Sequence, residues 1–422
     1  MISKEIENSF ISILEEELVL ATGCTEPIAI AFCAAKMREV LGAVPDRVRA
    51  EVSGNIIKNA KSVVVPNTGS LKGISAAIAA GVVAGDPNKN LQVISAIEPE
   101  KRAEIKAYLD TCPIGISCMD TLIPLDIMIT GYKGSSYAAV RISNNHTNIV
   151  YIEKDGRILR SEPVSANSED NLTDKSVLNV KSIVEFADTV ELGRIKELIL
   201  RQAECNFAIA EEGIKNSWGA NIGSVLLDSA NDVKTVARAY AAAGSDARMS
   251  GCEMPVVIVS GSGNQGITAS VPVICYAKKL NVSEEKMIRA IVLSDLITIH
   301  QKTGIGRLSA YCGSVSAGCG AGAGIAYLYG ADAGTIARTV TNAVVILSGT
   351  VCDGAKASCA AKISCSVEAG IMGYEMAKLG QSFPDGDGIA AADVEKTICN
   401  VGRLASEGMK QTDKTILSIM TS

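Results

Sequence analysis

The chain has 422 residues, of which 47% are hydrophobic and 20% charged, so it can bury a large core and form two or three domains. The net charge of −6 gives no electrostatic reason to expect nucleic acid or an anionic membrane as a partner. Aromatic residues make up only 4%, with one Trp, which also argues against stacking platforms for nucleic-acid bases.

The N-terminal segment and the two most apolar stretches bear on location. Residues 4–20 have the pattern of an acidic amphipathic helix and lack the basic, apolar and small-residue sections of a secretory signal. Residues 75–85 and 316–330 are dense in Gly and Ala and fall short of the roughly 20 strongly apolar residues that cross a bilayer. We expect a cytoplasmic protein without a membrane partner, in which these stretches are buried helices in close contact.

Hydrophobic periodicity predicts the elements in chain order. Two helices come first, followed by a strand-like stretch on both sides of a polar turn, and then a third helix, over residues 4–20, 25–41, 47–66 and 67–83. A strand, a helix and three short strands are expected next, over residues 91–97, 98–110, 126–134, 136–143 and 148–156. From about residue 174 the chain reads as helical again, after a polar, linker-like segment at residues 161–176.

These elements predict a mixed α and β fold, with a mainly helical catalytic domain and a smaller α+β domain. We expect residues 1–85 and 165–422 to form the helical catalytic domain, and residues 86–164 to form the small α+β domain inserted between them.

Cysteine usage narrows the possible chemistry. The chain has thirteen cysteines, an odd number, and no secretory signal, so a disulfide framework is not expected. Only two histidines are present, which nearly removes zinc sites and catalytic triads built on imidazole. Buried inert thiols, catalytic thiolates, and metal or iron–sulfur ligands stay open.

A glycine-rich turn follows an apolar run. Gly261, Gly263 and Gly266 match the dinucleotide fingerprint G-x-G-x-x-G, but Pro272 lies inside the expected crossover helix and no strand ending in an acid follows. We prefer a small-anion cradle, in which backbone N–H groups bind a carboxylate together with the side chains of Ser262, Asn264 and Gln265.

A second polar cluster lies between two apolar runs. It contains amide, hydroxyl and ammonium groups, on Ser53, Asn55, Lys58, Asn59, Asn67 and Thr68. A hydrogen-bonded turn and a ligand pocket explain it equally well. In the pocket reading, Lys58 is the natural partner for a carboxylate.

Cys24 precedes a helix start. Thr25 and Glu26 are capping residues and Pro27 is favoured in a first helical turn, so Cys24 should lie at the N-terminal end of an apolar helix. The positive end of the helix dipole favours the thiolate and should lower the pKa of Cys24. A nucleophile or general base is then as plausible as an inert buried cysteine.

The remaining cysteines of interest come in two pairs. Cys352 and Cys359 are seven residues apart, as are Cys312 and Cys319, so each pair could share one face of a helix. This spacing differs from the C-x-x-C of zinc ribbons and bacterial ferredoxins, so spacing by itself does not establish a metal centre.

Five motifs in order resemble the L-cysteine desulfidase family, which is related to the iron–sulfur L-serine dehydratases. They are GCTEPIAIA (23–31), SGNIIKNAKSVVVPNTG (53–69), SGSGNQGI (260–267), KTGIGRLSAYC (302–312) and VCDGAKASCA (351–360). The resemblance implies a 4Fe–4S cluster held by Cys312, Cys352 and Cys359, with one iron left open. It also implies Cys24 as the catalytic base. Cys319 and Cys365 are assigned to the interior, although the spacing would let either replace a ligand.

The function implied is elimination of sulfide from L-cysteine without pyridoxal phosphate, giving pyruvate, ammonia and hydrogen sulfide. The open iron would bind the leaving sulfur as a Lewis acid, and the thiolate would remove the Cα proton. Dehydration of L-serine is the alternative within the same chemistry, and a non-catalytic protein that binds an amino acid or small anion is the alternative of another class. The expected partner is an amino-acid substrate, and a homo-oligomer is possible.

Overall fold

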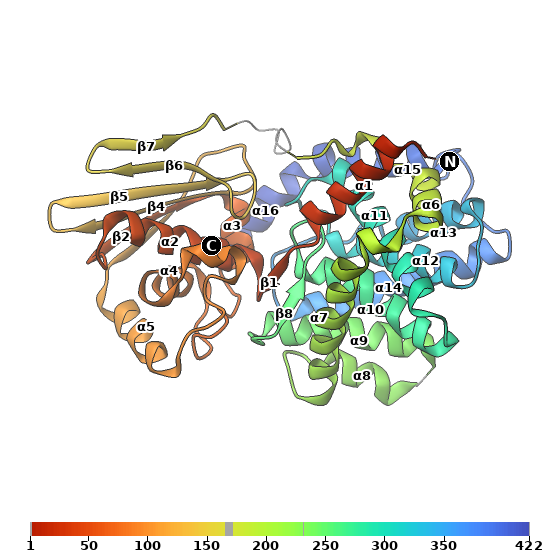
Figure 1. Ribbon diagram of the computed structural model, residues 1–422, viewed down its shortest axis with the longest axis horizontal. Coiled ribbons are helices and arrows are strands. Elements are labelled where there is room, and N and C mark those ends of the chain that lie inside the picture. Colours follow the sequence, from red (N-terminus) through yellow and green to blue (C-terminus); the bar gives the residue numbers. More distant parts are fainter. Residues whose placement is uncertain (1, 165–171, 231, 422) are drawn as a thin grey trace.

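The computed structural model of the protein describes residues 2–164, 172–230 and 232–421, and these form two lobes that lie side by side (Figure 1). The smaller one, called the sheet lobe here, contains α2 (Thr25–Leu41), β2 (Arg47–Val52), α3 (Gly54–Ala60), α4 (Gly73–Ala84), α5 (Pro99–Thr111), β3 (Ile114–Cys118), β4 (Asp126–Lys133), β5 (Ser136–Ser143), β6 (Ile149–Lys154) and β7 (Arg157–Ser161).

The second lobe, called the helical lobe, contains α1 (Lys4–Glu17), β1 (Leu20–Thr22), α6 (Val180–Thr189), α7 (Lys196–Lys215), α8 (Ile222–Ser229), α9 (Val233–Met249), β8 (Pro255–Val257), α10 (Gly263–Leu280), α11 (Glu284–Ile305), α12 (Gly313–Leu328), α13 (Ala333–Leu347), α14 (Ser358–Lys378) and α15 (Val394–Arg403). The last helix, α16 (Lys410–Thr421), leaves this lobe and packs on α3 of the sheet lobe. The predicted class, mixed α and β with a helical majority, is confirmed.

The six-stranded sheet has the order β3-β2-β4-β5-β6-β7, with β2 parallel to β3 and the other neighbours antiparallel. In β2 the residues Val48, Ala50 and Val52 alternate with more exposed ones, so one face of the strand is buried. Helix α2 packs against β4 and β5, and α4 packs against α2. The core of the sheet lobe therefore lies between its sheet and these two helices.

This packing corrects the predicted grouping of the segments. We expected residues 1–85 to pack with the later helices, yet β2 is an inner strand between β3 and β4, and α2 contacts the sheet. Residues 25–85 therefore pack with residues 86–161, because β2 completes a sheet whose other strands come later in the chain. Residues 165–171 of the expected linker lie outside the described residues.

Two local predictions are also wrong. Residues 91–97 form no strand; a 3₁₀-helix at Pro87–Gln92 leads into turns instead. Where we expected a polar turn after β2, the chain forms helix α3. Its first helical hydrogen bond runs from Ile57 N–H to the Ser53 carbonyl at 3.1 Å. Alternating apolar residues favour a strand, but tertiary packing can override this preference and bury them on a helix instead.

The glycine-rich helices are close-packed, as expected. A Cβ added to Gly322 of α12 would lie 2.6 Å from the carbonyl carbon of Gly370 in α14, and one added to Gly370 would lie 3.0 Å from that of Gly318. Gly81 of α4 meets the backbone of Ala31 in α2 in the same way. Within the described part of the chain, no helix is both long enough and apolar enough to cross a membrane.

We expect Gly370→Ala to destabilise the protein by about 1 to 3 kcal/mol, because the added methyl group forces α12 and α14 apart. Denaturant unfolding of both proteins measures the difference. Gly193→Ala is the matched control, since no atom lies within 4 Å of a Cβ at Gly193 and its φ is not positive. Equal stability of Gly370→Ala and the wild type would show that α12 and α14 are not closely packed at this position.

A buried carboxyl group links α11 to α7. Asp295 is fully buried and accepts a hydrogen bond from Gln202 Nε2 at 2.9 Å, while its second oxygen has no partner among the described residues. Burial raises the pKa of Asp295 to about 8, against an ordinary value near 3.8. The folded protein therefore favours the neutral acid, and its stability falls as the pH rises from about 4 to about 8.

Asp295→Asn keeps the acceptor for Gln202 and has no charge to bury. We expect it to be more stable than the wild type at pH 8.5 by a few kcal/mol, at about 1.4 kcal/mol per unit of pKa shift. This advantage should shrink toward pH 5. Guanidinium unfolding at both pH values measures it, and a difference that does not change with pH would contradict the assigned ionisation.

Candidate active site

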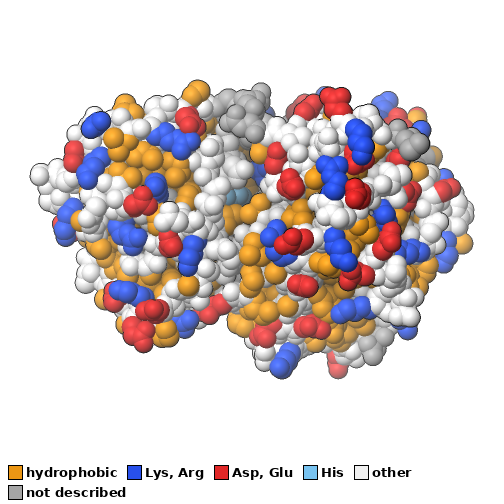
Figure 2. All heavy atoms as spheres, viewed as in Figure 1, with side chains coloured by type: hydrophobic (Ala, Val, Ile, Leu, Met, Phe, Trp, Pro, Cys, Tyr) orange, Lys and Arg blue, Asp and Glu red, His pale blue; other side chains and the backbone are white. Residues whose placement is uncertain are grey.

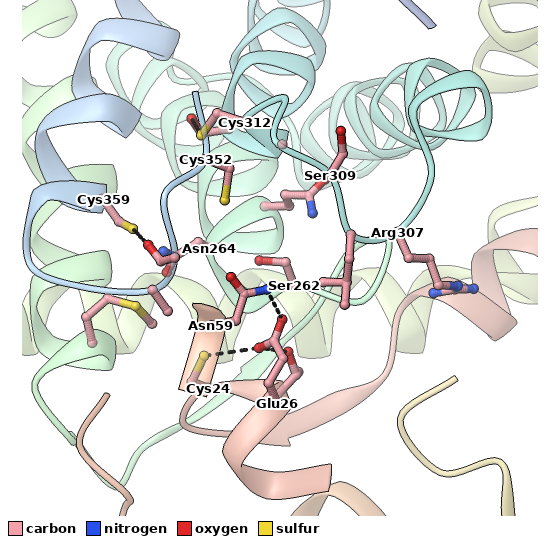
Figure 3. Close-up of a pocket in the computed structure, with 18 of the residues that line it drawn as sticks. Cys24, Glu26, Asn59, Ser262, Asn264, Arg307, Ser309, Cys312, Cys352 and Cys359 are labelled. Atoms are coloured by element: carbon pink, nitrogen blue, oxygen red, sulfur yellow. Dashed lines mark hydrogen bonds between the residues drawn. The ribbon is translucent and has the colours of Figure 1, made fainter. Parts of the chain in front are cut away.

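A partly open cavity of about 100 Å³ lies where the two lobes meet (Figure 3). The chain crosses between the lobes here, because β1 pairs with β8 in the helical lobe and the next helix, α2, belongs to the sheet lobe. Among the described helices, four begin at this cavity, through Cys24 before α2, Ser262 before α10, Cys312 before α12, and Cys359 in the first turn of α14. The positive ends of their dipoles make the cavity suitable for anions.

Three cysteines line this cavity together: Cys352 and Cys359, which are close in sequence, and Cys312, which comes from an earlier segment (Figure 3). Cys312 is buried, with Sγ 3.0 Å from Ser314 Oγ, and Cys359 Sγ lies 3.6 Å from the Gly354 carbonyl. Cys352 is close to both, since an isolated bridge between Tyr311 and Val351 joins the segment before α12 to the segment before α14. The motifs predicted these three residues together, and the fold brings them together.

The arrangement of these thiols distinguishes between two kinds of metal site. Among the described residues, no three His, Cys, Asp or Glu side chains converge as ligands of a single metal ion do. An iron–sulfur cluster differs, because each thiolate binds a different iron and the ligands surround the cluster. Three thiols from separate elements around one cavity fit this second pattern.

Burial sets the protonation of the thiols. It raises the pKa of Cys359 to about 11 and raises that of Cys312, to which the neighbouring Cys352 also contributes. Buried thiols of this kind are protonated near neutral pH unless a cation or a metal stabilises the thiolate.

The two cysteines that could have replaced a ligand lie elsewhere. Cys319 is buried within α12, as expected, and donates to the Val340 carbonyl at 3.4 Å. The expectation that Cys365 is also in the interior is wrong, because it is exposed on α14. Neither lines the cavity. All thirteen cysteines are within the described residues, and each has a free thiol.

Cys24 is the residue that precedes α2, as expected, but its electrostatics differ from the expectation. Its thiol is buried and donates to Glu26 Oε2 at 3.2 Å, and Asn59 Nδ2 donates to the other oxygen of Glu26 at 3.1 Å. Burial first and the Glu26 charge second raise the pKa of Cys24 well above its usual value, although the Arg248 charge opposes them. The predicted lowering by the helix dipole is therefore wrong, because desolvation outweighs it.

The predicted anion cradle lines the cavity through Ser262, Asn264 and Gln265. Ser262 precedes α10, and the other two side chains project from its first turn. Asn264 Oδ1 accepts a hydrogen bond from Arg248 Nη1 at 3.0 Å, and Gln265 Oε1 is buried without a partner among the described residues. Asn264 thus has a partner within the chain, whereas the Gln265 oxygen has none among the described residues.

Only Asn59 of the second polar cluster lines the cavity. Ser53 Oγ donates to the Pro124 carbonyl at 2.6 Å, Asn67 Nδ2 to the Ile94 carbonyl at 2.9 Å, and Thr68 Oγ1 to the Val65 carbonyl at 2.7 Å. Only the Thr68 bond closes a local turn, and the other two join segments that are distant in the chain, so these three side chains have structural partners. Asn55, in the first turn of α3, lies outside the cavity as well.

Lys58 has a partner that the sequence could not indicate. It is buried and forms an ion pair with Asp413 of α16, so it ties the last helix to α3 and does not reach the cavity. The expectation that Lys58 binds a carboxylate is right in chemistry, but the carboxylate belongs to the chain itself.

Three cationic residues also line this cavity. Lys302 is buried, which lowers its pKa to about 8, and the Arg307 guanidinium donates to Glu17 at 2.7 and 3.3 Å. Arg307 also lines a second cavity of about 460 Å³ between the lobes. Figure 2 shows the outer face of this junction, with acidic and basic side chains interspersed on both lobes. Arg248, the third cationic residue at the smaller cavity, lies near the end of α9.

The chain is similar in sequence to known proteins along its whole length. A UPF0597 protein of Desulfitobacterium hafniense is 57% identical over 98% of this chain and 96% of its own length. UPF0597 proteins of Lachnoclostridium phytofermentans and Treponema denticola are 50% and 44% identical, over 97% and 99% of this chain and 98% and 99% of their own lengths.

The family model described as serine dehydratase alpha chain matches residues 88–418, which include Cys312, Cys352 and Cys359 but not Cys24. This match indicates a lyase of the serine dehydratase type. The chain belongs to the serine dehydratase alpha-chain family and is a relative of the UPF0597 proteins along its whole length.

Proposed function

We propose that the protein removes sulfide from L-cysteine by α,β-elimination and forms pyruvate, ammonia and hydrogen sulfide without pyridoxal phosphate. The observation that carries this proposal is the shared cavity, in which the thiols of Cys312, Cys352 and Cys359 face a fourth, Cys24, that hydrogen-bonds a carboxylate. Family membership supports the reaction class, and the choice of L-cysteine over L-serine is the finer part of the proposal.

Cys312, Cys352 and Cys359 would hold a 4Fe–4S cluster. Their thiols border one cavity and project from separate elements, and soft thiolates are the ligands that such clusters prefer. With three protein ligands the bound cluster supplies a Lewis-acidic iron for the leaving group. The cavity position of Cys359, compared with the exposed Cys365, supports Cys359 as the third ligand.

Cys24 would remove the Cα proton. The thiol must first lose its own proton, and Glu26 Oε2 is already its hydrogen-bond acceptor. Because burial raises the pKa of this thiol, its thiolate is a stronger base toward a weakly acidic C–H bond than an exposed one. Asn59 stabilises the Glu26 carboxylate on its other side.

The bond changes balance without an oxidant or reductant. The Cα–H and Cβ–S bonds break, a Cα=Cβ bond forms, and sulfide leaves with a proton. The resulting aminoacrylate takes up water and gives pyruvate and ammonia. Asn59 Oδ1 and Gln265 Oε1 are acceptors without partners among the described residues, and they would bind the substrate ammonium group. Ser262 and Asn264 complete the polar wall.

L-Serine dehydration is the second candidate, and the description of the matching family favours it. Anaerobically purified protein should be assayed on L-cysteine and L-serine side by side, with sulfide and pyruvate measured. We expect sulfide and pyruvate in equal amounts from L-cysteine, at a higher kcat/KM than pyruvate from L-serine. Faster turnover of L-serine would make the protein a dehydratase, and ligand binding without any product would make it a binding protein.

A further inference from the structure

Arg248 is a buried cation whose charge is not matched by the chain. It lies in the last turn of α9, and only 2% of the residue is exposed. Its Nη1 donates to Asn264 Oδ1 at 3.0 Å, whereas Nε and Nη2 have no partner among the described residues. No described carboxylate forms an ion pair with it; the nearby Glu26 is engaged by Cys24, Thr25 and Asn59.

The fold makes room for this guanidinium at the start of α10. A Cβ at Gly263 would lie 2.8 Å from Arg248 Cζ, so only glycine lets the side chain lie against the helix terminus. An unpaired guanidinium in such a place is costly, because it gives up its hydration without a counter-charge. The cost is recovered when an anion enters the cavity that Arg248 lines.

The free edge has the geometry that carboxylates prefer. Nε and Nη2 point the same way, and a carboxylate can accept from both at once. Another arginine of the protein binds a carboxylate in this way: Arg141 Nε and Nη2 donate to the two oxygens of Asp126 at 2.8 and 2.6 Å. At Arg248 the same two nitrogens have no carboxylate partner among the described residues.

We propose that the Nε and Nη2 edge of Arg248 binds the α-carboxylate of the amino-acid substrate. The proposal rests on the proposed function for the identity of the ligand. Arg248 and Cys24 line the same small cavity, so a carboxylate held by Arg248 keeps the adjacent Cα within the space that Cys24 faces. Asn264 is then a positioning residue, since it holds Nη1 while Nε and Nη2 stay without a partner among the described residues.

The test compares two ligands that cannot undergo elimination. L-Alanine has the amine and the carboxylate, whereas L-alaninamide replaces the carboxylate by a neutral amide. Both are titrated by calorimetry into anaerobically purified holoprotein. The wild type should prefer L-alanine, and Arg248→Gln should weaken L-alanine binding by about 10- to 100-fold, as expected for charged hydrogen bonds. Binding of L-alaninamide should change little.

Arg238→Gln is the matched control, because Arg238 lies on the same helix but is paired with Glu368 outside the cavity. It should retain the full preference for L-alanine. If Arg248→Gln does not fold, as judged by circular dichroism, Arg248→Lys provides the test: it keeps the charge, loses the fork, and should show a smaller but measurable loss of preference.

The proposal is overturned if the wild type has no preference for L-alanine, or if the Arg248 variants retain it. Loss of iron from Arg248→Gln with an unchanged preference would also overturn it and would assign Arg248 to the cysteine charges instead. Sulfide release is measured separately. A preference that depends on Arg248 in a protein that releases no sulfide would overturn the elimination but not this binding role.

Discussion

Cys352→Ala should yield a folded protein that contains neither iron nor acid-labile sulfide and that turns over neither L-cysteine nor L-serine. The side chain is only half-buried and packs at the edge of the cavity, so its loss should cost little stability. Losing one of three ligands removes the Lewis acid, which is worth several kcal/mol of transition-state stabilisation, or about a thousandfold or more in rate.

Cys365→Ala is the control for this result. Cys365 lies on α14, six positions after Cys359 in the sequence, but it is exposed and outside the cavity. It should keep its iron, its sulfide and its activity. If Cys365→Ala loses the cluster and Cys352→Ala retains it, the assignment of the ligands is wrong.

Cys24→Ala should separate chemistry from cluster binding. The variant is expected to keep its iron and sulfide, because Cys24 projects from the opposite side of the cavity and hydrogen-bonds to Glu26 (Figure 3). Its kcat should fall by about 10²- to 10⁴-fold, the usual contribution of a positioned general base. Steady-state kinetics and iron analysis on the same preparation measure both quantities.

Cys33→Ala serves as the matched variant, since Cys33 lies on the same helix and donates to the Val140 carbonyl at 3.3 Å within the sheet lobe. It should retain the wild-type rate. A Cys24→Ala protein that keeps most of its rate would exclude this thiol as the proton acceptor.

Local sequence signals predicted the parts of the site that are built locally. The Thr-Glu-Pro start of α2 placed Cys24 correctly before a helix, and the glycine-rich turn placed Ser262 and its neighbours at the start of α10. The Gly and Ala stretches predicted α4 and α12 as close-packed helices. In each case the residues that determine the structure are neighbours in the chain.

Predictions failed where the partner is distant in sequence. Lys58 pairs with Asp413, which lies 355 positions later in the sequence. Strand β2 pairs with β4, which comes much later in the chain. No sequence motif surrounds Arg248, so its role could not be predicted from the sequence. It follows from the burial of its guanidinium and from the unpartnered Nε and Nη2, which only the fold shows. The pKa of Cys24 failed for a related reason, since a helix start is visible in a sequence but the depth of burial is not.

The central claim is that the three thiols of one cavity bind a single iron–sulfur cluster. Quantifying iron and acid-labile sulfide in the anaerobically purified wild-type protein tests it most directly. We predict about four of each per chain, the composition of a 4Fe–4S cluster, and their joint loss on exposure to air. Active protein that contains no iron, or iron without sulfide, would contradict it.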